Sequence, residues 1–204
     1  MRLGRGGRGR QVRLEDLARG AVAEAAPGGV VEPVGEPAEV GDRETFGHWE
    51  CDLLIFRKEH GKANVTALVE RKSRYTFLLP SGDKRSAAVL GRVADALRPL
   101  PEDARRTVTF DRGSEFAAYA ALDRELVVGS FFCDPHSPWQ KGGVENLNGR
   151  ARRFLPRESP PEALARVRLR RLADRLNDTP RRCLGYRTPR EVFERHLAAP
   201  TVPP

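Results

Sequence analysis

The chain has 204 residues and a formal net charge of +8, from 36 Lys and Arg against 28 Asp and Glu. This length is enough for one domain with its own hydrophobic core and a short tail. No stretch reaches the roughly 18 apolar residues of a membrane span, and no apolar segment follows the basic N-terminus as in a secretory signal. Three widely spaced cysteines do not make a disulfide framework, so the sequence predicts a cytoplasmic protein with no membrane partner.

The charge is unevenly distributed along the chain. The segment from Lys141 to Pro204 holds 15 Lys and Arg against 7 Asp and Glu, whereas the first 140 residues hold 21 of each kind. Residues 1–13 hold five of these basic residues and no acid, so residues 14–140 have a net charge of −5. A basic segment attracts polyanions such as nucleic acid, and an acidic middle segment can hold metal ions. An ordinary solvated surface rich in arginine is the alternative, and charge alone leaves the two open.

Composition also divides the chain into three parts. Residues 1–42 contain a Gly/Arg head and then AAPGGVVEPVGEPAEVGD, a composition typical of a flexible linker, with a short helix predicted over Leu14–Ala26. Residues 43–197 carry the periodic patterns of a folded core, and residues 198–204 are predicted to be a disordered tail.

The core begins with three strands joined by short turns. They are expected over Gly47–Arg57, Ala63–Arg71 and Arg74–Pro80, which predicts an antiparallel meander. Strand alternation divides the first strand into two faces. One face carries Glu50, Asp52 and Leu54, and the other carries Cys51, Leu53 and Ile55.

Helices and strands then alternate. A helix capped by Asp83 is expected to run to about Arg98, and a short strand over Arg106–Phe110 ends at Asp111. A helix over Ser114–Leu126 and a strand over Leu126–Cys133 follow. The order β-β-β-α-β-α-β predicts an α/β fold with a five-stranded mixed sheet flanked by helices.

Three further helices are expected after this sheet. The first begins at Ser137, or a few residues later because Gly142-Gly143 weakens its start. Its predicted apolar stripe is Val144, Leu147, Ala151, Phe154 and Leu155, and its polar face is Lys141, Glu145, Asn148 and Arg152. The second covers Pro161–Leu176, with Ala165, Leu169, Leu172 and Leu176 inward and Arg166, Arg170 and Arg171 outward. The last begins at Thr188-Pro189, with Glu191 completing a capping box.

Three acidic residues are placed where their carboxylates can meet. Asp52 lies in the first strand, Asp111 follows the fourth strand, and Glu145 lies on the polar face of the helix after the fifth strand. Enzymes that transfer phosphoryl groups on DNA often use two divalent metal ions, and hard cations such as Mg²⁺ prefer carboxylate oxygens. Solvated surface acids are the alternative. The sequence also leaves open three nearby acids, namely Glu50, Glu115 and Asp134.

Several segments in order resemble one known family. The segments are GHWECDLLI, LVERKSRYTFLLP, TFDRGSEFA, FFCDPHSPWQKGGVENLNGRARRFLPRE and RLNDTPRRCLGYRTPREVF. Together they resemble the insertion-sequence transposases of the IS30 family, whose core is an RNase H-like integrase fold with a DDE motif. The resemblance covers about residues 43–197, and the 33 residues between the second and third acids match the family spacing.

The resemblance implies a site and an activity. The catalytic residues fall on Asp52, Asp111 and Glu145, which would bind two Mg²⁺ or Mn²⁺ ions. The implied reaction is strand cleavage at insertion-sequence ends and strand transfer into target DNA. Terminal-repeat and target DNA are the implied partners of a homo-oligomer that has no small-molecule substrate and works at the bacterial nucleoid.

The sequence departs from the family in two places. Cys51 stands where the family usually has glycine, on the strand face opposite Asp52. Family members also carry a helix-turn-helix region before the core, and residues 1–42 are expected to be too short and too rich in Gly and Pro to form one. A truncated, catalytically incompetent DNA-binding remnant is therefore one alternative, and a metal-dependent nuclease that only hydrolyses DNA is another.

A set of polar residues near the third acid is predicted to contact DNA: Trp139, Lys141, Asn146, Asn148, Arg150, Arg152 and Arg153. Phosphate contact is favoured for Lys141 over an ion pair with Glu145. For Trp139, stacking on an unpaired base and anchoring of the helix start are equally open. The arginines and asparagines have a solvated helix face as their alternative.

A zinc site built from two Cys/His pairs is disfavoured. The pairs are His48 with Cys51 and Cys133 with His136. Residues three apart on a strand point to opposite faces, so the first pair cannot bind one ion together. His136 is predicted instead to be a loop residue at the rim of the active site.

Overall fold

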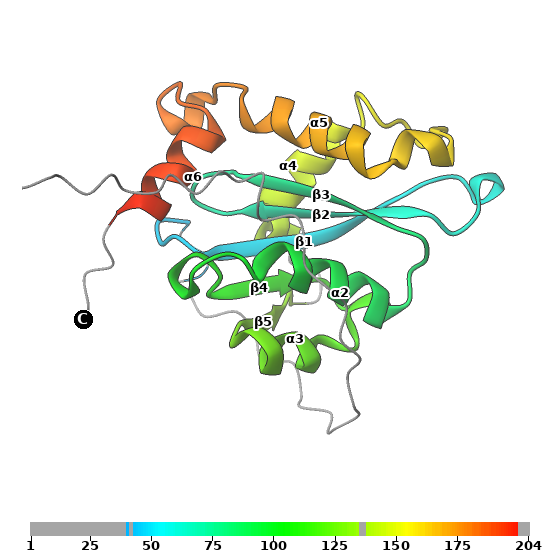
Figure 1. Ribbon diagram of the computed structural model, residues 1–204, viewed down its shortest axis with the longest axis horizontal. Helices are drawn as coiled ribbons and strands as arrows, with labels where there is room; N and C mark the ends of the chain where they lie inside the picture. Colours follow the sequence, from blue (N-terminus) through cyan, green and yellow to red (C-terminus); the bar gives the residue numbers. More distant parts are fainter. Residues whose placement is uncertain (1–39, 41–42, 135–137, 200–204) are drawn as a thin grey trace, which may run out of the picture.

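The computed structural model describes residue 40 and residues 43–134 and 138–199. Its centre is a five-stranded mixed sheet in the order β3-β2-β1-β4-β5, with helices on both sides (Figure 1). The strands are β1 His48–Ile55, β2 Asn64–Glu70, β3 Thr76–Ser81, β4 Thr107–Phe110 and β5 Gly129–Phe132. Strands β1, β2 and β3 pair antiparallel, while β4 pairs parallel to both β1 and β5. The predicted α/β fold with a five-stranded mixed sheet is confirmed.

The alternation along β1 creates two separate cores. Cys51 and Leu53 face one buried cluster with the helices α2 (Ser86–Leu97) and α3 (Tyr119–Leu126). Leu54 faces the other cluster with α4 (Gly142–Ala151) and α5 (Arg166–Asn177). The sheet is therefore the middle layer of three, and Asp52 points to the same side of β1 as Leu54, toward α4.

Several predicted boundaries on the α2 and α3 side were wrong. The N-cap of α2 is Arg85, and the Asp83 carboxylate accepts a hydrogen bond from the Arg85 backbone N–H in a turn before the helix. The predicted helix from Ser114 is interrupted, because a 3-10 turn over Ser114–Phe116 precedes α3. Strand β5 is shorter than predicted, since α3 keeps Leu126 and Val127 adopts a left-handed conformation (φ 54°).

On the other side, α4 begins later than Ser137. A 3-10 turn over Pro138–Lys141 comes first, and α4 starts at Gly142, as the Gly-Gly pair suggested. Its apolar stripe is buried except for Phe154, which lies beyond the end of the helix and is 44% exposed. The second predicted helix is a 3-10 turn over Pro161–Leu164 followed by α5, so Ala165 is exposed rather than inward, while its arginines point outward as predicted.

Helix α6 (Pro189–Ala198) has the predicted start. The Thr188 side chain accepts from the Glu191 backbone N–H, and the Glu191 side chain accepts from the Thr188 N–H. The helix carries fully buried Phe193, whose ring stacks on Tyr75 with centroids 4.2 Å apart and meets Trp49 edge-on. This aromatic cluster fixes α6 to the end of the sheet that holds the start of β1.

The start of β1 depends on a glycine and a buried carboxylate. Gly47 has φ +97°, and a Cβ there would lie 2.2 Å from the Asp103 carbonyl oxygen. Its N–H donates to the Glu70 carboxylate, which also accepts from the Ser73 N–H and hydroxyl. One buried side chain thus closes the β2–β3 turn and the beginning of β1 together.

Some predictions fall outside the described residues. They are the helix over Leu14–Ala26, the Ser137 cap, and the character of residues 1–39, 41–42 and 200–204. Of the predicted tail over residues 198–204, Ala198 instead belongs to α6. Shorter 3-10 turns cover Lys58–His60, Glu102–Ala104 and Arg182–Leu184. Among the described residues, no helix is both long and apolar enough to cross a membrane.

We expect Phe193→Ala to destabilise the fold by about 3–5 kcal/mol, because it removes a buried aromatic side chain and leaves a cavity. The matched control is Glu194→Ala at the exposed neighbouring position, which should change stability by no more than about 0.5 kcal/mol. Urea unfolding followed by circular dichroism measures both. Equal stability of the two variants would show that α6 does not pack as described.

Candidate active site

The parallel pairing of β1 and β4 brings two of the three predicted acids together. Glu50 of β1 pairs with Thr109 of β4. Asp52 lies two residues after Glu50, and Asp111 lies two residues after Thr109, so the parallel pairing places the two aspartates side by side. The Asp111 side chain also accepts a hydrogen bond from the Gly113 N–H (3.1 Å), which orients the carboxylate at the end of β4. The sheet therefore fixes where both carboxylates lie.

Lys141 lies between these two carboxylates. Its Nζ is 3.0 Å from Asp111 Oδ2 and 3.5 Å from Asp52 Oδ1, and its side chain is only 11% exposed. Burial by itself lowers the pKa of Lys141, but the charges of Asp52 and Asp111 outweigh it, so the pKa is raised. Glu145 was the predicted alternative partner of Lys141. Lys141 instead forms ion pairs with the two aspartates.

The polar face of α4 covers the same acids. Asn148 donates from Nδ2 to Asp52 Oδ2 at 2.7 Å. Glu145 and Asn148 are three residues apart in α4 and lie on the same side of the helix, and Lys141 ends the 3-10 turn directly before it. Glu145 is exposed on that face, between two residues that contact the aspartates. Within residues 43–134 and 138–199, however, no three His, Cys, Asp or Glu side chains lie close enough to form a ready metal cluster.

The donor set nevertheless fits a divalent cation. One carboxylate oxygen from each aspartate approaches the same cationic atom, Lys141 Nζ. The positive charge at this point already offsets part of the negative charge of the two aspartates. Mg²⁺ and Mn²⁺ prefer such hard oxygen ligands. Asp52 and Asp111 would hold such an ion, and Glu145 is the next carboxylate along the face of α4.

The start of α4 is held by a buried ion pair that sequence reasoning missed. Glu50 and Arg71 are 0% and 1% exposed, and Oε1 lies 3.2 Å from Nε. Glu50 Oε2 accepts from the Val144 N–H at 2.7 Å, in the first turn of α4. Burial raises the pKa of Glu50, while Arg71 and the Val144 N–H act in the opposite direction.

Arg71 extends this anchor to neighbouring segments. Its guanidinium donates to the carbonyl oxygens of Val40 (2.5 Å) and Gln140 (2.8 Å). Gln140 lies directly before Lys141. Arg71 therefore contacts the backbone before α4 directly, and it contacts the first turn of α4 through Glu50. The available sequence signal was the position of Glu50, two residues before Asp52 on the same strand face.

Gly143 makes this close approach possible. A Cβ at Gly143 would lie 2.8–3.0 Å from the carboxylate atoms of Glu50, closer than real Cβ contacts come. Gly149, later in the same helix, has open space where its Cβ would be. The Gly-Gly pair that weakens the helix start therefore lets α4 lie against the buried carboxylate.

The predicted DNA-contacting residues do not form one set. Arg152 turns toward the protein, donating to the Ile55 carbonyl oxygen at 2.7 Å and stacking its guanidinium over Phe56. Arg150 donates to the Asn146 side chain. Arg153 is exposed. Pro138 to Lys141 form the 3-10 turn, but the side chain of Trp139 lies outside what the structure describes.

The disfavoured zinc site finds no support in the described region. His48 is buried, and its Nδ1 lies 2.8 Å from the Thr107 hydroxyl. Cys51 is buried in the core on the α2 side. Burial raises the pKa of the Cys51 thiol well above its usual value, which disfavours the thiolate that a metal needs. His136 lies outside the described residues.

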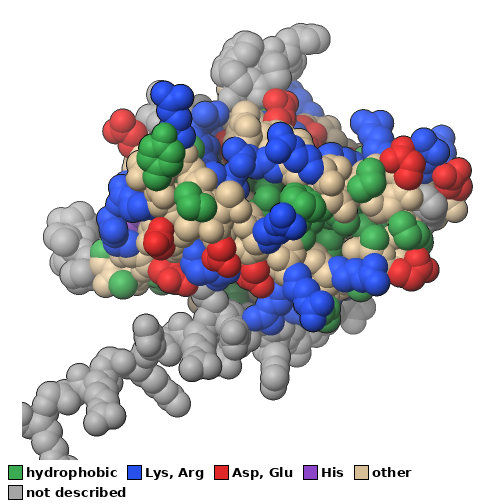
Figure 2. Space-filling view, turned by 90° about the horizontal axis from the view of Figure 1, so that it is seen from above, with side chains coloured by type: hydrophobic (Ala, Val, Ile, Leu, Met, Phe, Trp, Pro, Cys, Tyr) green, Lys and Arg blue, Asp and Glu red, His purple; other side chains and the backbone are tan. Residues whose placement is uncertain are grey.

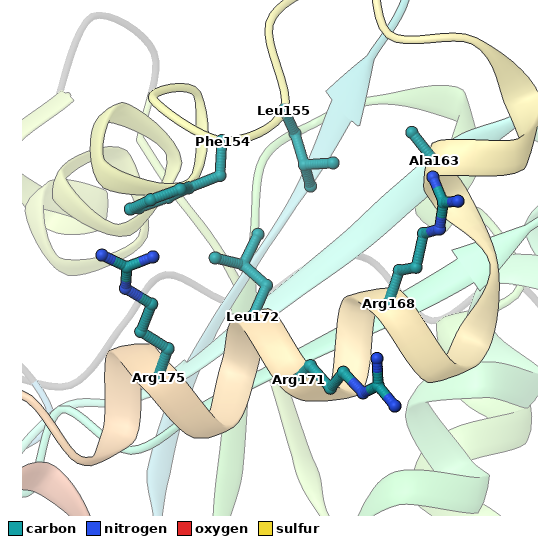
Figure 3. A pocket seen from close by; sticks show the side chains of 7 residues that line it. All are labelled: Phe154, Leu155, Ala163, Arg168, Arg171, Leu172 and Arg175. Carbon is teal, nitrogen blue, oxygen red and sulfur yellow. The ribbon is translucent and has the colours of Figure 1, made fainter.

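Two hollows lie away from the aspartates. One, of about 320 Å³, lies between the end of α4 and α5 and is lined by Phe154, Leu155, Ala163, Arg168, Arg171, Leu172 and Arg175 (Figure 3). The Arg175 guanidinium lies 4.6 Å from the centre of the Phe154 ring. Figure 2 looks onto this side and shows basic side chains interspersed with hydrophobic ones. The second hollow lies at the end of the molecule that carries α6.

Comparison with solved structures identifies the fold. The catalytic core domain of BIV integrase superimposes with a TM-score of 0.55 at 19% identity, covering 74% of this chain and 95% of that one. A chain of the simian T-cell lymphotropic virus intasome, in complex with PP2A regulatory subunit B56 gamma, gives a TM-score of 0.61 at 16% identity, covering 78% and 57%. The integrase core domain family model matches residues 42–138. The chain therefore has the fold of these integrase core domains.

Proteins with similar sequences indicate which kind of integrase-fold protein the chain resembles. The transposase for insertion sequence element IS1086 of Cupriavidus metallidurans is 39% identical over 165 residues, covering 81% of this chain and 48% of that protein. Transposase InsI for insertion sequence element IS30C of Escherichia coli is 37% identical over 159 residues, covering 78% and 41%. The chain is a homologue of the IS30-family transposases, and it spans about half the length of these relatives or slightly less.

We expect Gly143→Ala to impair any activity of the site, because the added methyl group pushes α4 away from Glu50 and displaces Glu145 and Asn148. Gly149→Ala is the matched control and should stabilise α4 by about 0.5–1 kcal/mol. Hydrogen exchange at the Val144 amide should be faster in Gly143→Ala only. If both variants protect this amide equally, the carboxylate does not anchor the helix.

Proposed function

We propose that the chain is the catalytic core of a DNA transposase, which cleaves DNA strands at insertion-sequence ends and transfers those ends into target DNA. The observation that carries this proposal is the convergence of Asp52 and Asp111 on one cationic centre beneath the α4 face that bears Glu145. The integrase fold and the named transposase relatives support it.

The proposed cofactor is a pair of divalent cations, Mg²⁺ or Mn²⁺, held by Asp52, Asp111 and Glu145. When bound, such ions activate a water or a DNA 3′-hydroxyl and stabilise the leaving oxygen. The protein supplies rigid positions for the carboxylates: two on neighbouring strands and one on a helix fixed by buried Glu50.

Two side chains on the same face would assist. Asn148 holds Asp52 in one orientation through the 2.7 Å hydrogen bond. Lys141 neutralises the aspartates while no other cation is present, and in the complex its ammonium would contact the phosphate that borders the site. The proposed partners are terminal-repeat DNA and target DNA, with the protein acting as a homo-oligomer.

Two alternative functions differ from this proposal in what happens to the bound DNA, and only the second would use the same acidic residues. A DNA-binding remnant would bind DNA with strong salt dependence and leave it uncut. A metal-dependent nuclease would hydrolyse DNA without joining it. The charge balance at Asp52, Asp111 and Lys141 favours a working site over a decayed one, because all three side chains form one connected arrangement.

We expect Glu145→Gln to abolish metal-dependent strand transfer, since the amide replaces a charged ligand while keeping the shape of the side chain. DNA binding measured without divalent metal should persist. Glu162→Gln, at an exposed position before α5, is the matched control and should leave strand transfer unchanged. Joining by Glu145→Gln at the normal rate would refute the catalytic assignment.

The substrate of this assay separates the three functions. A DNA duplex with a pre-cleaved 3′-hydroxyl end is supplied together with a target plasmid. A transposase core yields joined product, a nuclease yields only cut DNA, and a remnant yields neither.

We also expect millimolar Mg²⁺ to raise the melting temperature. A cation at 100 times its Kd stabilises the folded chain by about 2.7 kcal/mol, which corresponds to several degrees in a domain of this size. Asp111→Asn should remove most of this Mg²⁺-dependent shift, because one of the converging carboxylates is replaced by a neutral amide. The comparison uses NaCl of matched ionic strength, and an undiminished shift in the variant would place the metal elsewhere.

A further inference from the structure

A second strongly charged feature lies at the end of the molecule that carries α6. A hollow of about 640 Å³ is lined by five basic side chains and one acidic one, from three separate segments. They are Arg43, Lys72, Arg74, Arg187, Arg195 and Glu44. We call it the basic hollow. This end lies on the left in both views, and Figure 2 shows basic side chains there as well as across the rest of the face.

Four basic side chains of the hollow have no ion pair among the interactions of the described residues. Neither Lys72, Arg74, Arg187 nor Arg195 forms an ion pair with any carboxylate that the structure describes. His196 also lines the hollow. Burial is the main cause that lowers the pKa of His196, and the positive charges of Lys72 and Arg195 lower it further. Five basic side chains against one acidic one leave an excess of positive charge in the hollow, which favours binding of an anion there.

The backbone is also strained around this hollow. Arg43 and Arg74 have φ of 63° and 64°, and Tyr186 between two lining residues has 63°. Left-handed backbone is unusual for residues other than glycine, and such strain gathers at functional sites. The fold thus holds basic side chains together at a cost in backbone conformation.

The hollow is distinct from the site of Asp52 and Asp111, and β1 runs from beside the hollow to Asp52. The Arg71 N–H donates to the His48 carbonyl oxygen, so Lys72 follows directly beside the start of β1. Asp52 lies four residues further along this strand, or about 13 Å. Phosphates of one DNA strand recur about every 3.4 Å along the axis, so this distance is roughly four base pairs.

We propose that the basic hollow binds backbone phosphates of duplex DNA, a few base pairs from the strand end that lies at Asp52 and Asp111. This inference rests on the proposed function and adds a second contact to it. The contact is electrostatic and independent of sequence, because Lys and Arg from three segments meet phosphates without reaching base edges. It keeps the duplex in one direction relative to the active site.

A cysteine at the hollow provides a direct probe. Cys183 lines the hollow and is exposed, whereas Cys51 and Cys133 are buried. The full chain is treated with N-ethylmaleimide, without divalent metal, and alkylation of Cys183 is followed by mass spectrometry. A saturating short DNA duplex should slow this alkylation several-fold. Inorganic phosphate at millimolar concentration should not.

Charge variants test the same contact without the thiol. Lys72→Gln with Arg195→Gln should weaken duplex binding and reduce the slope of log K against log salt by about 0.9 for each phosphate that the protein no longer neutralises. The control pair, Arg92→Gln with Arg124→Gln, removes the same charge from exposed positions on α2 and α3. Thermal melting of each variant confirms folding.

The outcomes separate this inference from the proposed function. Protection of Cys183 together with selectively weaker binding by the first pair supports the inference. Unchanged alkylation at saturating duplex, equally weakened binding by both pairs, or equal protection by phosphate overturns it. A duplex that binds and is joined without protecting Cys183 overturns the inference alone, whereas protection without joining contradicts only the proposed function.

Discussion

The buried ion pair between Glu50 and Arg71 is the constraint on which the site depends. It lies in the layer between the sheet and α4, and it connects β1, the end of β2 and the first turn of α4. Removal of one partner would leave an uncompensated buried charge, at a cost of about 3–5 kcal/mol. Because Glu50 is two residues from Asp52, the same strand carries a positioning carboxylate and a candidate metal ligand.

The net charge of the chain takes a different meaning in this structure. The basic C-terminal segment begins at Lys141, yet this lysine is not on the solvated surface; it balances two aspartates inside the site. Arg152 likewise turns inward to the β1 backbone. Basic side chains at the surface lie elsewhere, along α5 and at the α6 end. Charge counted along the sequence left a polyanion partner and a solvated surface equally open, and it did not indicate which basic residues lie at the surface.

Much of the fold could be predicted because strand alternation and helix periodicity are local properties. The two faces of β1, the meander and the capping box at Thr188 all follow from neighbouring residues. The proximity of Asp52 and Asp111 could also be predicted, since neighbouring strands bring residues at matching positions side by side. The contacts of Lys141 and Glu50 could not be predicted, because each joins residues 30 to 94 positions apart. Family resemblance selected Glu145, and its convergence with the aspartates remains a prediction.

The central claim is that Asp52, Asp111 and Glu145 form one metal site. A crystal of the chain grown with Mn²⁺ tests it most directly, because the anomalous signal locates the ion without reference to activity. We expect a peak within roughly 2.1 Å of oxygens of both aspartates, with Glu145 turned toward it and the Lys141 ammonium displaced. A Mn²⁺ peak elsewhere, with Lys141 still between the aspartates, would contradict the claim.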